Sequence, residues 1–379
     1  MVQFSIWEKE TFLAPQDVII VGSGFAGLWS AFHLIRKNPK HKILIVDRGV
    51  IPSGASARNA GFACFGSVSE LMYDVKTMGT EKMLQLVEMR YRGLRLIQEY
   101  FDSDIIDLDL CGGYELFDAT EKVSSERLNE NITYLNALLK EITKTKRTFQ
   151  LRNDKIEKFA FAGIKHLVKN KLEGYLHSGK LLQCLLQYVQ KRGVQLLTGI
   201  EVTGFNVTNK VELATDKNFT LSANQLLICT NAFANELLPH AQITPARGQV
   251  LLTTPIKNLP WKGTFHYDEG FYYFRNLGNR VLLGGARNKA FEEEQTTDLQ
   301  ISDFIQNELE KFLDEVILPE QKKNYSIEHR WSGIMGMGAD KLPSVKQVEP
   351  NVFCAIGMGG MGVAVAPVIG RDAARLILK

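Results

Sequence analysis

The stretch Asp17-Val-Ile-Ile-Val-Gly-Ser-Gly-Phe-Ala-Gly27 decides the fold of this chain. It opens with a short run rich in β-branched residues, which predicts a buried strand. Gly22, Gly24 and Gly27 follow that run directly and begin an amphipathic stretch that ends near Pro39. In this context the first glycine permits a tight turn, the second lets the backbone approach a pyrophosphate, and the third lets helix and strand pack closely. The stretch therefore predicts a Rossmann unit that binds a dinucleotide.

An acidic residue stands where the ribose of such a dinucleotide needs an acceptor. A second β-branched run, residues 43–46, closes a βαβ unit, and Asp47 follows it, 20 residues beyond Gly27. Its carboxylate is expected to accept hydrogen bonds from the ribose hydroxyls. We also assign three neighbours of these motifs to the cofactor site, namely Phe25, Ala26 and Arg48. This fingerprint alone does not separate FAD from NAD.

The composition argues against several classes of partner. With 45 basic and 42 acidic residues the net charge is +3, which gives no general attraction to nucleic acid or to a membrane. The lysine-rich stretches 144–147 and 165–171 are interrupted by apolar residues and fit a solvated face better than a nucleic-acid surface. The first residues hold Glu8, Lys9 and Glu10 where a secretory signal needs an apolar run. No stretch approaches the ~18 consecutive apolar residues of a membrane span.

The cysteines indicate a reducing compartment. Their odd number and the absence of close pairs argue against a disulfide framework and against a zinc site. They are Cys64, Cys111, Cys184, Cys229 and Cys354. We therefore expect a cytoplasmic protein with no metal, no nucleic-acid partner and no membrane span.

The loop after the acid points to one cofactor. Pro52-Ser-Gly-Ala-Ser-Ala-Arg-Asn-Ala-Gly61 consists of small residues with one Arg and one Asn. At these residues the sequence resembles the D-amino-acid oxidase and glycine oxidase family of FAD enzymes, whose loop reads Gly-Ala-Ser-x-Arg-Asn-x-Gly. The resemblance implies FAD as the cofactor, with four residues of the loop near its phosphates, ribityl chain or ring. They are Ser56, Arg58, Asn59 and Ala60.

The same resemblance adds contacts further along the chain. It places Val202 at the adenine, and Thr230 and Asn231 in a turn near the cofactor. Gly333 lies in the region where sarcosine oxidases attach the flavin to a cysteine. No cysteine is present there, so the FAD is expected to be released unmodified.

A second glycine loop, Gly357-Met-Gly-Gly-Met-Gly362, also follows a predicted strand, residues 352–356. A second dinucleotide site would need a further strand with an acid about twenty residues on, and only 17 residues follow Gly362. We expect instead a helix over residues 363–378 whose N-terminus faces the flavin ring and stabilises its negative charge on reduction. An ordinary strand-to-helix turn is the alternative. The loop residues assigned to the cofactor are Gly357, Gly359, Gly360, Met361 and Gly362.

An aromatic strand is the candidate wall of the substrate site. In Phe271-Tyr-Tyr-Phe-Arg275 the period of two puts Phe271, Tyr273 and Arg275 on one face and the other two residues on the opposite face. With Trp331, this face suits an amine or its aliphatic chain. The competing interpretation, aromatic residues as the core of a second domain, stays open. Tyr273, Arg275, Trp331 and Arg58 are our candidates for the catalytic site.

One departure from the family bears on the substrate. Amino-acid oxidising members carry Gly-Leu-Arg-Pro where this chain has Ile334-Met335, so the Arg that clamps the substrate carboxylate is missing. The motif after Trp331 is more similar to γ-glutamylputrescine oxidoreductase-like amine oxidases. This favours an amine without an α-carboxylate, unless Arg275 or Arg287 replaces the clamp.

Two further points concern the chemistry. Arg58 is the only permanent charge between Ala55 and Val68, so it is a candidate to stabilise reduced flavin or to orient the substrate, and a phosphate contact is the alternative. Sarcosine oxidases use a Lys near the position of Leu282 to speed the reaction with oxygen. The electron acceptor, O2 or another molecule, is therefore left open.

The pieces predict an α/β fold, α+β overall, in which a Rossmann-like FAD-binding domain carries an inserted mixed-sheet and helical substrate domain. At 379 residues the chain exceeds the ~250–300 at which one core stops growing. Ser178 is expected to cap one of the helices. The FAD-binding pieces are expected at residues 1–78, 151–245 and 328–379, and the substrate pieces at 79–150, a helical insertion, and 246–327.

The expected function is that of an FAD-dependent oxidoreductase that oxidises a C–N bond of a small amine or amino acid by hydride transfer to flavin N5. A dedicated catalytic base is not required for a neutral amine, because orientation and electrostatics carry the step. Two alternatives remain: a sarcosine-type N-demethylating oxidase or dehydrogenase, and a flavin-binding redox protein without turnover.

Overall fold

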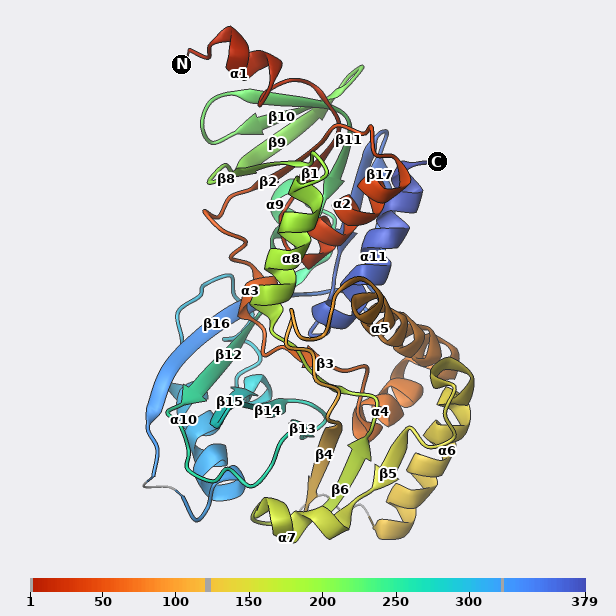
Figure 1. The fold of residues 1–379 in the computed structure, drawn as a ribbon, viewed down its shortest axis with the longest axis vertical. Helices are drawn as coiled ribbons and strands as arrows, with labels where there is room; N and C mark the ends of the chain where they lie inside the picture. Colours follow the sequence, from red (N-terminus) through yellow and green to blue (C-terminus); the bar gives the residue numbers. More distant parts are fainter. Residues whose placement is uncertain (1–2, 120–123, 322–323) are drawn as a thin grey trace.

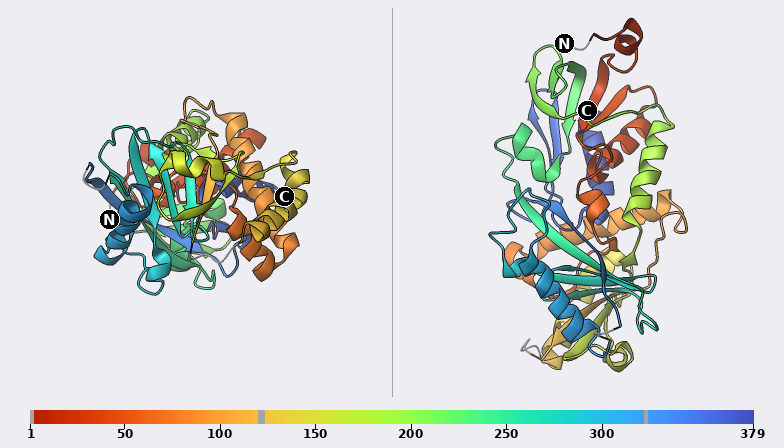
Figure 2. Two further views of the ribbon diagram at one scale, coloured as in Figure 1. Left: turned by 90° about the horizontal axis from the view of Figure 1, so that it is seen from below. Right: turned by 90° about the vertical axis from the view of Figure 1, so that its left-hand side faces the viewer.

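The molecule has two parts, each built on a large sheet. The computed structural model describes residues 3–119, 124–321 and 324–379. Figure 1 shows one part at the top, with both ends of the chain, and the other at the bottom. The right-hand view of Figure 2, turned by 90° about the vertical axis, shows the same two parts following one another along the long axis. The short elements α3 (Ala55–Arg58) and β3 (Phe62–Ala63) lie at the junction.

The first sheet grows from the strand that the opening motif predicts. β1 (Gln16–Val21) pairs in parallel with β2 (Ile43–Asp47) on one side and β11 (Thr220–Ile228) on the other. The strand order is β17-β18-β11-β1-β2-β8, and the hairpin β9–β10 joins at β11. Burial of these parallel strands on both faces explains their continuous apolar sequences. The other strands are β8 (Gln195–Thr198), β9 (Val202–Val207), β10 (Val211–Thr215), β17 (Ser344–Glu349) and β18 (Val352–Ile356).

Three helices pack over this sheet, and backbone contacts fix one of them. They are α2 (Phe25–Lys37), α8 (Ser178–Gln190) and α11 (Gly362–Ile377). A Cβ on Gly370 would lie 2.5 Å from the backbone carbon of Trp29, so α11 touches α2 directly. A Cβ on Gly93 of α5 (Thr80–Tyr100) would lie 1.7 Å from the carbonyl oxygen of Ala364. These contacts hold α11 in place as it runs from the junction to the C-terminus (Figure 1).

The second sheet has the order β16-β12-β15-β14-β13-β4-β6-β5. One face packs on α10 (Asp303–Phe312) and the π-helical turn after it (Leu313–Ile317). The strands are β4 (Gly113–Asp118), β5 (Phe149–Leu151), β6 (Ile164–Asn170), β12 (Thr244–Thr253), β13 (Thr264–Tyr267), β14 (Tyr272–Leu277), β15 (Arg280–Gly285) and β16 (Ile327–Met337). β3 pairs with β7 (Gly174–Tyr175).

The remaining helices are α1 (Ile6–Glu10), α4 (Val68–Met78), α6 (Ser125–Thr143), α7 (Ile156–Phe159) and α9 (Ala234–Leu237). The 3₁₀ turns are η1 (Asn153–Lys155), η2 (Asn231–Phe233) and η3 (Arg287–Lys289).

Sheet pairing differs from the expected pieces of the chain. β6, expected in the nucleotide domain, pairs with β4, and β16, also expected there, pairs with β12 along its length. A strand pattern gives the period of a segment and not its partner, which explains the difference. We therefore propose a domain division that follows the two sheets. Ser178 is the first residue of α8 and not its cap, because the side chain of His177 accepts the hydrogen bond from the Lys180 N–H.

Candidate functional site

The glycine turn after β1 has the geometry of a pyrophosphate site. Gly22 has φ +105°, and a Cβ there would lie 2.8 Å from the carbonyl oxygen of Cys229. A Cβ on Gly27 would lie 2.0 Å from the carbonyl oxygen of Gly22. Gly24 differs, because its Cβ position meets only the Ser56 side chain, with the hydroxyl at 3.0 Å. The turn is therefore closed at Gly22 and Gly27 and open at Gly24, where the backbone can approach a phosphate.

The start of α2 can hold negative charge. The N-cap residue Gly24 has no side chain to accept a hydrogen bond from the helix, and the first turn contains no acidic residue. The Phe25 N–H donates to the Ser56 hydroxyl at 2.8 Å, and Ala26 continues the turn. The N–H groups and dipole of this helix end fit the pyrophosphate of a dinucleotide.

Asp47 is fixed at the end of β2 beside this turn. Its Oδ2 accepts from the Ser23 N–H at 2.8 Å and the Ser23 hydroxyl at 2.6 Å, and Oδ1 accepts from the Gly49 N–H at 2.8 Å. The side chain remains half-buried, so the carboxylate is held in one orientation while part of it stays accessible. This fits an acceptor for the ribose hydroxyls.

Arg48 directly follows Asp47, and Val202 directly follows Glu201, an ion-pair partner of Arg48. The Arg48 guanidinium stacks over the Phe233 ring at 3.9 Å and pairs with Glu236 at 3.2 Å and Glu201 at 3.5 Å. Val202, the first residue of β9, is buried in the core of the first sheet. The contact of both residues with the adenosine of the cofactor stays a prediction.

Hydrogen bonds of the Asn59 side chain hold the small-residue loop in place. Its side-chain carbonyl accepts from the Gly61 N–H at 2.8 Å and from the Ser178 hydroxyl at 2.6 Å. Its amide donates to the carbonyls of Ala55 and Ser56. Asn59 thus joins α3 to the start of α8, and the next residue, Ala60, is buried.

Arg58 and Trp331 fasten the loop to β16. The Arg58 guanidinium donates to the carbonyls of Ser53 and Ser332, both at 2.9 Å. The Trp331 indole N–H donates to the carbonyl of Arg58 at 2.9 Å. A Cβ on Gly333 would lie 3.0 Å from the Arg58 Cβ, so α3 and β16 are in close contact there. The structure thus brings these three residues together at the junction, with the Arg58 charge held by main-chain oxygens.

The C-terminal glycine loop ends at an uncapped helix. Gly357 and Gly359 have positive φ, +77° and +56°. No heavy atom of the described residues lies within 4 Å of a Cβ on Gly359, and a Cβ on Gly360 would meet only the Met335 sulfur at 3.8 Å. Met361 stands at the N-cap position of α11 but its side chain accepts no hydrogen bond from the helix, and the first turn has no acidic residue. Nearby, the buried Thr230 hydroxyl has no partner in the described part of the chain, as expected for a group that contacts a bound cofactor.

The aromatic strand has the alternation that its sequence predicts. On β14, Tyr272 and Phe274 pack into the core beside α10, while Tyr273 faces Phe62 of β3, with ring centroids 5.7 Å apart. His266 of β13 contacts Phe62 as well, at 5.1 Å. Phe271 precedes the strand and packs against Phe291, so it does not share the face of Tyr273 as expected.

Burial sets the charge states of this wall. It raises the pKa of Tyr273 to about 12, against the influence of Arg287, and it lowers the pKa of His266 to about 4. Both side chains are therefore neutral at neutral pH. The His266 Nε2 atom is buried and has no hydrogen-bond partner among the described residues.

The two candidate arginines differ in access. Arg275 is only 5% exposed, and its guanidinium lies 4.6 Å above the Tyr175 ring and 3.5 Å from the Leu176 carbonyl, beneath Gly61. Burial lowers its pKa to about 10. Arg287, in the turn after β15, is half-buried, and burial lowers its pKa while Glu294 and Tyr273 oppose the shift. The structure therefore brings Arg287 beside Tyr273 and encloses Arg275.

Two buried carboxyl groups missed by the sequence interpretation hold the segment after β3. Glu173 accepts from the N–H groups of Phe65 at 2.7 Å and Gly66 at 3.1 Å. Glu115 accepts from the Ser67 hydroxyl and the Val68 N–H at the start of α4. Burial raises the pKa of Glu173 to about 8 and that of Glu115 to about 7. The only signal in the sequence is a lone acid in an apolar context.

We expect Glu173 to make the protein less stable as the pH rises. Between about pH 4.5 and 8 the folded state keeps its proton while the unfolded chain has lost it. The unfolded state then binds fewer protons, so the free energy of unfolding falls with pH, by up to about 1.4 kcal/mol per pH unit for one group. Glu173→Gln should flatten this slope in urea unfolding between pH 5.5 and 8. The exposed Glu81→Gln is the control, and an unchanged slope in Glu173→Gln would contradict the assignment.

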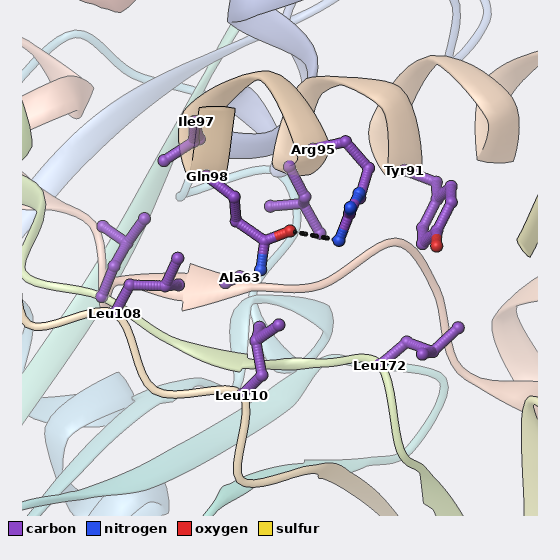
Figure 3. Close-up of a pocket in the computed structure, with 10 residues that line it drawn as sticks. Ala63, Tyr91, Arg95, Ile97, Gln98, Leu108, Leu110 and Leu172 are labelled. Atoms are coloured by element: carbon purple, nitrogen blue, oxygen red, sulfur yellow. Dashed lines mark hydrogen bonds between the residues drawn. The ribbon is translucent and has the colours of Figure 1, made fainter. Parts of the chain in front are cut away.

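A small apolar cavity is lined by Ala63, Leu172 and Leu176. Its volume is about 30 Å³, and Figure 3 shows it between α5 and the strand that carries Ala63, with the Arg95 to Gln98 hydrogen bond of 2.9 Å beside it. The other lining residues are Tyr91, Leu94, Ile97, Leu108 and Leu110. Pockets for organic ligands span about 300–1,000 Å³, so this cavity is not the cofactor site.

The glycine turn with its acid, the second glycine loop at a helix end and the aromatic strand of a second sheet define a dinucleotide-binding oxidoreductase. The chain belongs to the family described as FAD dependent oxidoreductase (DAO), whose model matches residues 17–376. The protein is therefore an FAD-dependent oxidoreductase, which confirms the predicted family, fold class and cofactor.

Similar proteins support this membership. A probable oxidoreductase OrdL of Haemophilus influenzae is 24% identical, covering 97% of this chain and 84% of its own. Gamma-glutamylputrescine oxidoreductase of Escherichia coli is 22% identical over 95% and 83% of the two chains. The structure of glycine oxidase from Geobacillus kaustophilus matches with a TM-score of 0.78 at 20% identity, over 96% of this chain and 95% of that one. L-proline dehydrogenase from P. horikoshii gives 0.77 at 20% identity, over 96% and 93%.

Within the described residues, none of the helices combines the length and the apolar character needed to cross a bilayer.

Proposed function

We propose that the protein oxidises a C–N bond of a small amine or amino acid. Bound FAD would supply the two-electron acceptor for the hydride that leaves the carbon beside the nitrogen, while the nitrogen lone pair of the amine forms the C=N bond. The residues that would hold it are the turn Gly22–Gly27, Asp47, the loop 56–60, and the C-terminal loop 357–362. The observation that carries the proposal is the neutral aromatic wall of Tyr273, Phe62 and His266 beside β3.

This wall orients an amine without presenting a charged side chain to it. Tyr273 and His266 stay uncharged at neutral pH, so they offer hydrogen bonds and ring faces without a competing charge. The rings also exclude water from the reacting carbon, which strengthens every electrostatic contact near it. Orientation of this kind supplies much of the rate for a step that needs no dedicated base.

Arg287 supports a substrate that also carries a carboxylate. Its guanidinium is half-buried beside Tyr273, and no Asp or Glu among the described residues lies within ion-pair distance of it. Glu294 acts on Arg287 only from beyond ion-pair distance and is itself paired with Arg247, so an anionic group of the substrate would stabilise the partly desolvated guanidinium. Arg287 thus takes the place of the clamp that is missing at Ile334-Met335.

An anaerobic reduction screen tests the proposed function. Purified holoenzyme is mixed with amines, N-methyl amino acids, and D- and L-amino acids, and the flavin absorbance is followed. We expect rapid bleaching by at least one amine that carries a carboxylate. Bleaching by N-methyl amino acids alone would indicate a sarcosine-type enzyme, and absence of bleaching with every compound would indicate a flavoprotein without amine turnover.

A further inference from the structure

Asn231 lies where three distant segments of the chain meet. It begins the η2 turn directly after β11, and its Oδ1 accepts from the N–H groups of Gly357 and Met358, both at 3.1 Å. Gly336, near the end of β16, packs against the same side chain, and a Cβ there would lie 2.6 Å from the Asn231 Oδ1. The Gly359 N–H donates to the Gly336 carbonyl at 3.0 Å. The Asn231 side chain therefore bonds the C-terminal glycine loop to the end of β11 in the first sheet, and it packs against Gly336 of the second sheet.

The backbone at this position restricts which residue can form the contact. Asn231 has φ +47°, a left-handed conformation that Gly, Asn and Asp adopt most readily. Gly lacks a side chain, so it would keep the turn and lose the acceptor. Asn combines the conformation with a neutral oxygen that can accept two N–H groups.

The contact acts on a glycine-rich loop that is otherwise held by the Gly359 N–H bond to Gly336 and by the buried Met358 side chain. Gly357 and Gly359 have positive φ, and the segment between β18 and α11 leads straight into the uncapped helix end at Met361. Glycine gives such a loop many accessible conformations. The two hydrogen bonds of Asn231 select among these conformations, and together with the Gly93 contact at Ala364 they position the α11 N-terminus.

We propose that Asn231 is a positioning residue that holds the α11 N-terminus against the flavin and so sets how strongly the protein prefers reduced over oxidised FAD. Reduction adds negative charge to the flavin, and a helix N-terminus stabilises that charge only within about one turn of its end. A displacement of the helix start therefore weakens the reduced form more than the oxidised form. The proposal rests on the α11 contact with the flavin and does not depend on the identity of the substrate.

The test compares Asn231→Gly with a matched asparagine in the same region. Asn235 also bonds to backbone groups, the N–H and carbonyl of Ile243, but does not touch the glycine loop. Photoreduction against reference dyes, without any amine, gives the flavin midpoint potential, and titration of apoprotein gives the affinity for oxidised FAD. We expect Asn231→Gly to lose about tenfold in its preference for reduced over oxidised FAD, a drop of about 30 mV in the midpoint potential, whatever its affinity for oxidised FAD. Asn235→Gly should leave the potential unchanged.

A second variant, on β16, disturbs the same Asn231 contact. Gly336→Ala places a Cβ 2.6 Å from the Asn231 Oδ1 and 2.9 Å from the Ala232 N, so it must displace the amide. Its potential should fall in the same direction as that of Asn231→Gly. An unchanged potential in both variants would overturn the proposal. Equal loss of affinity for oxidised and reduced FAD would also overturn it, because Asn231 would then serve cofactor binding alone.

Discussion

Gly24→Ala is expected to weaken FAD binding about 10- to 100-fold while the apoprotein unfolds at the same temperature. The backbone of Gly24, φ −71°, is one that Ala adopts freely, and the added Cβ meets only the Ser56 hydroxyl at 3.0 Å. In the holoenzyme the same Cβ would push the pyrophosphate away from the N–H groups of α2. Loss of one such charge-assisted hydrogen bond costs about 1.5–3 kcal/mol.

Titration of apoprotein with FAD and thermal unfolding of the apoprotein are the two measurements. Gly204→Ala in β9, where a Cβ would have no neighbour within 4 Å among the described residues, is the control and should change neither. Gly27→Ala should behave differently, because its Cβ would lie 2.0 Å from the Gly22 carbonyl oxygen and disturb the turn itself. FAD affinity equal to that of the parent in Gly24→Ala would show that no phosphate approaches this turn.

Arg287→Met is expected to lower kcat/KM for a carboxylate-bearing amine by about 10- to 100-fold, chiefly through KM. The change removes a charge-assisted hydrogen bond worth about 1.5–3 kcal/mol and keeps much of the side-chain volume over Phe291. An amine of the same length without the carboxylate should lose little. Steady-state kinetics with the matched pair of amines measures the difference.

The neighbouring Lys289 supplies the control for this variant. Lys289 is exposed and lies in the same turn, so Lys289→Met changes the charge by the same amount without touching the site. It should leave both amines unaffected. Equal losses for the two amines in Arg287→Met would remove Arg287 from carboxylate binding and favour an amine without a carboxylate.

Local sequence patterns predicted those parts of the site that local geometry determines. The turn at Gly22, the acid at Asp47 and the helix after Gly362 each follow from a strand, a turn and a helix that are adjacent in sequence. The alternation of Tyr272 and Tyr273 on β14 follows in the same way from the period of a strand.

Contacts between distant segments were not predictable from one sequence. The placement of Arg287 beside Tyr273 depends on the pairing of β14 with β15, and the enclosure of Arg275 depends on β3 crossing above it. Glu173 and Asn231 act on backbone groups more than 100 residues away, at Phe65 and Gly357. Such contacts are set by sheet order and by packing between the two parts, which periodicity does not specify.

Anaerobic single-turnover reduction with a carbon-deuterated amine tests the central claim most directly. The amine that bleaches the flavin fastest in the screen is compared with the same amine deuterated at the carbon beside the nitrogen. The amount of carbonyl product formed after hydrolysis is measured against the amount of reduced flavin. Hydride transfer from this carbon predicts slower flavin bleaching with the deuterated amine and one carbonyl product for each flavin reduced. Bleaching without an isotope effect at substrate saturation, or without a carbonyl product, would contradict oxidation of a C–N bond by hydride transfer.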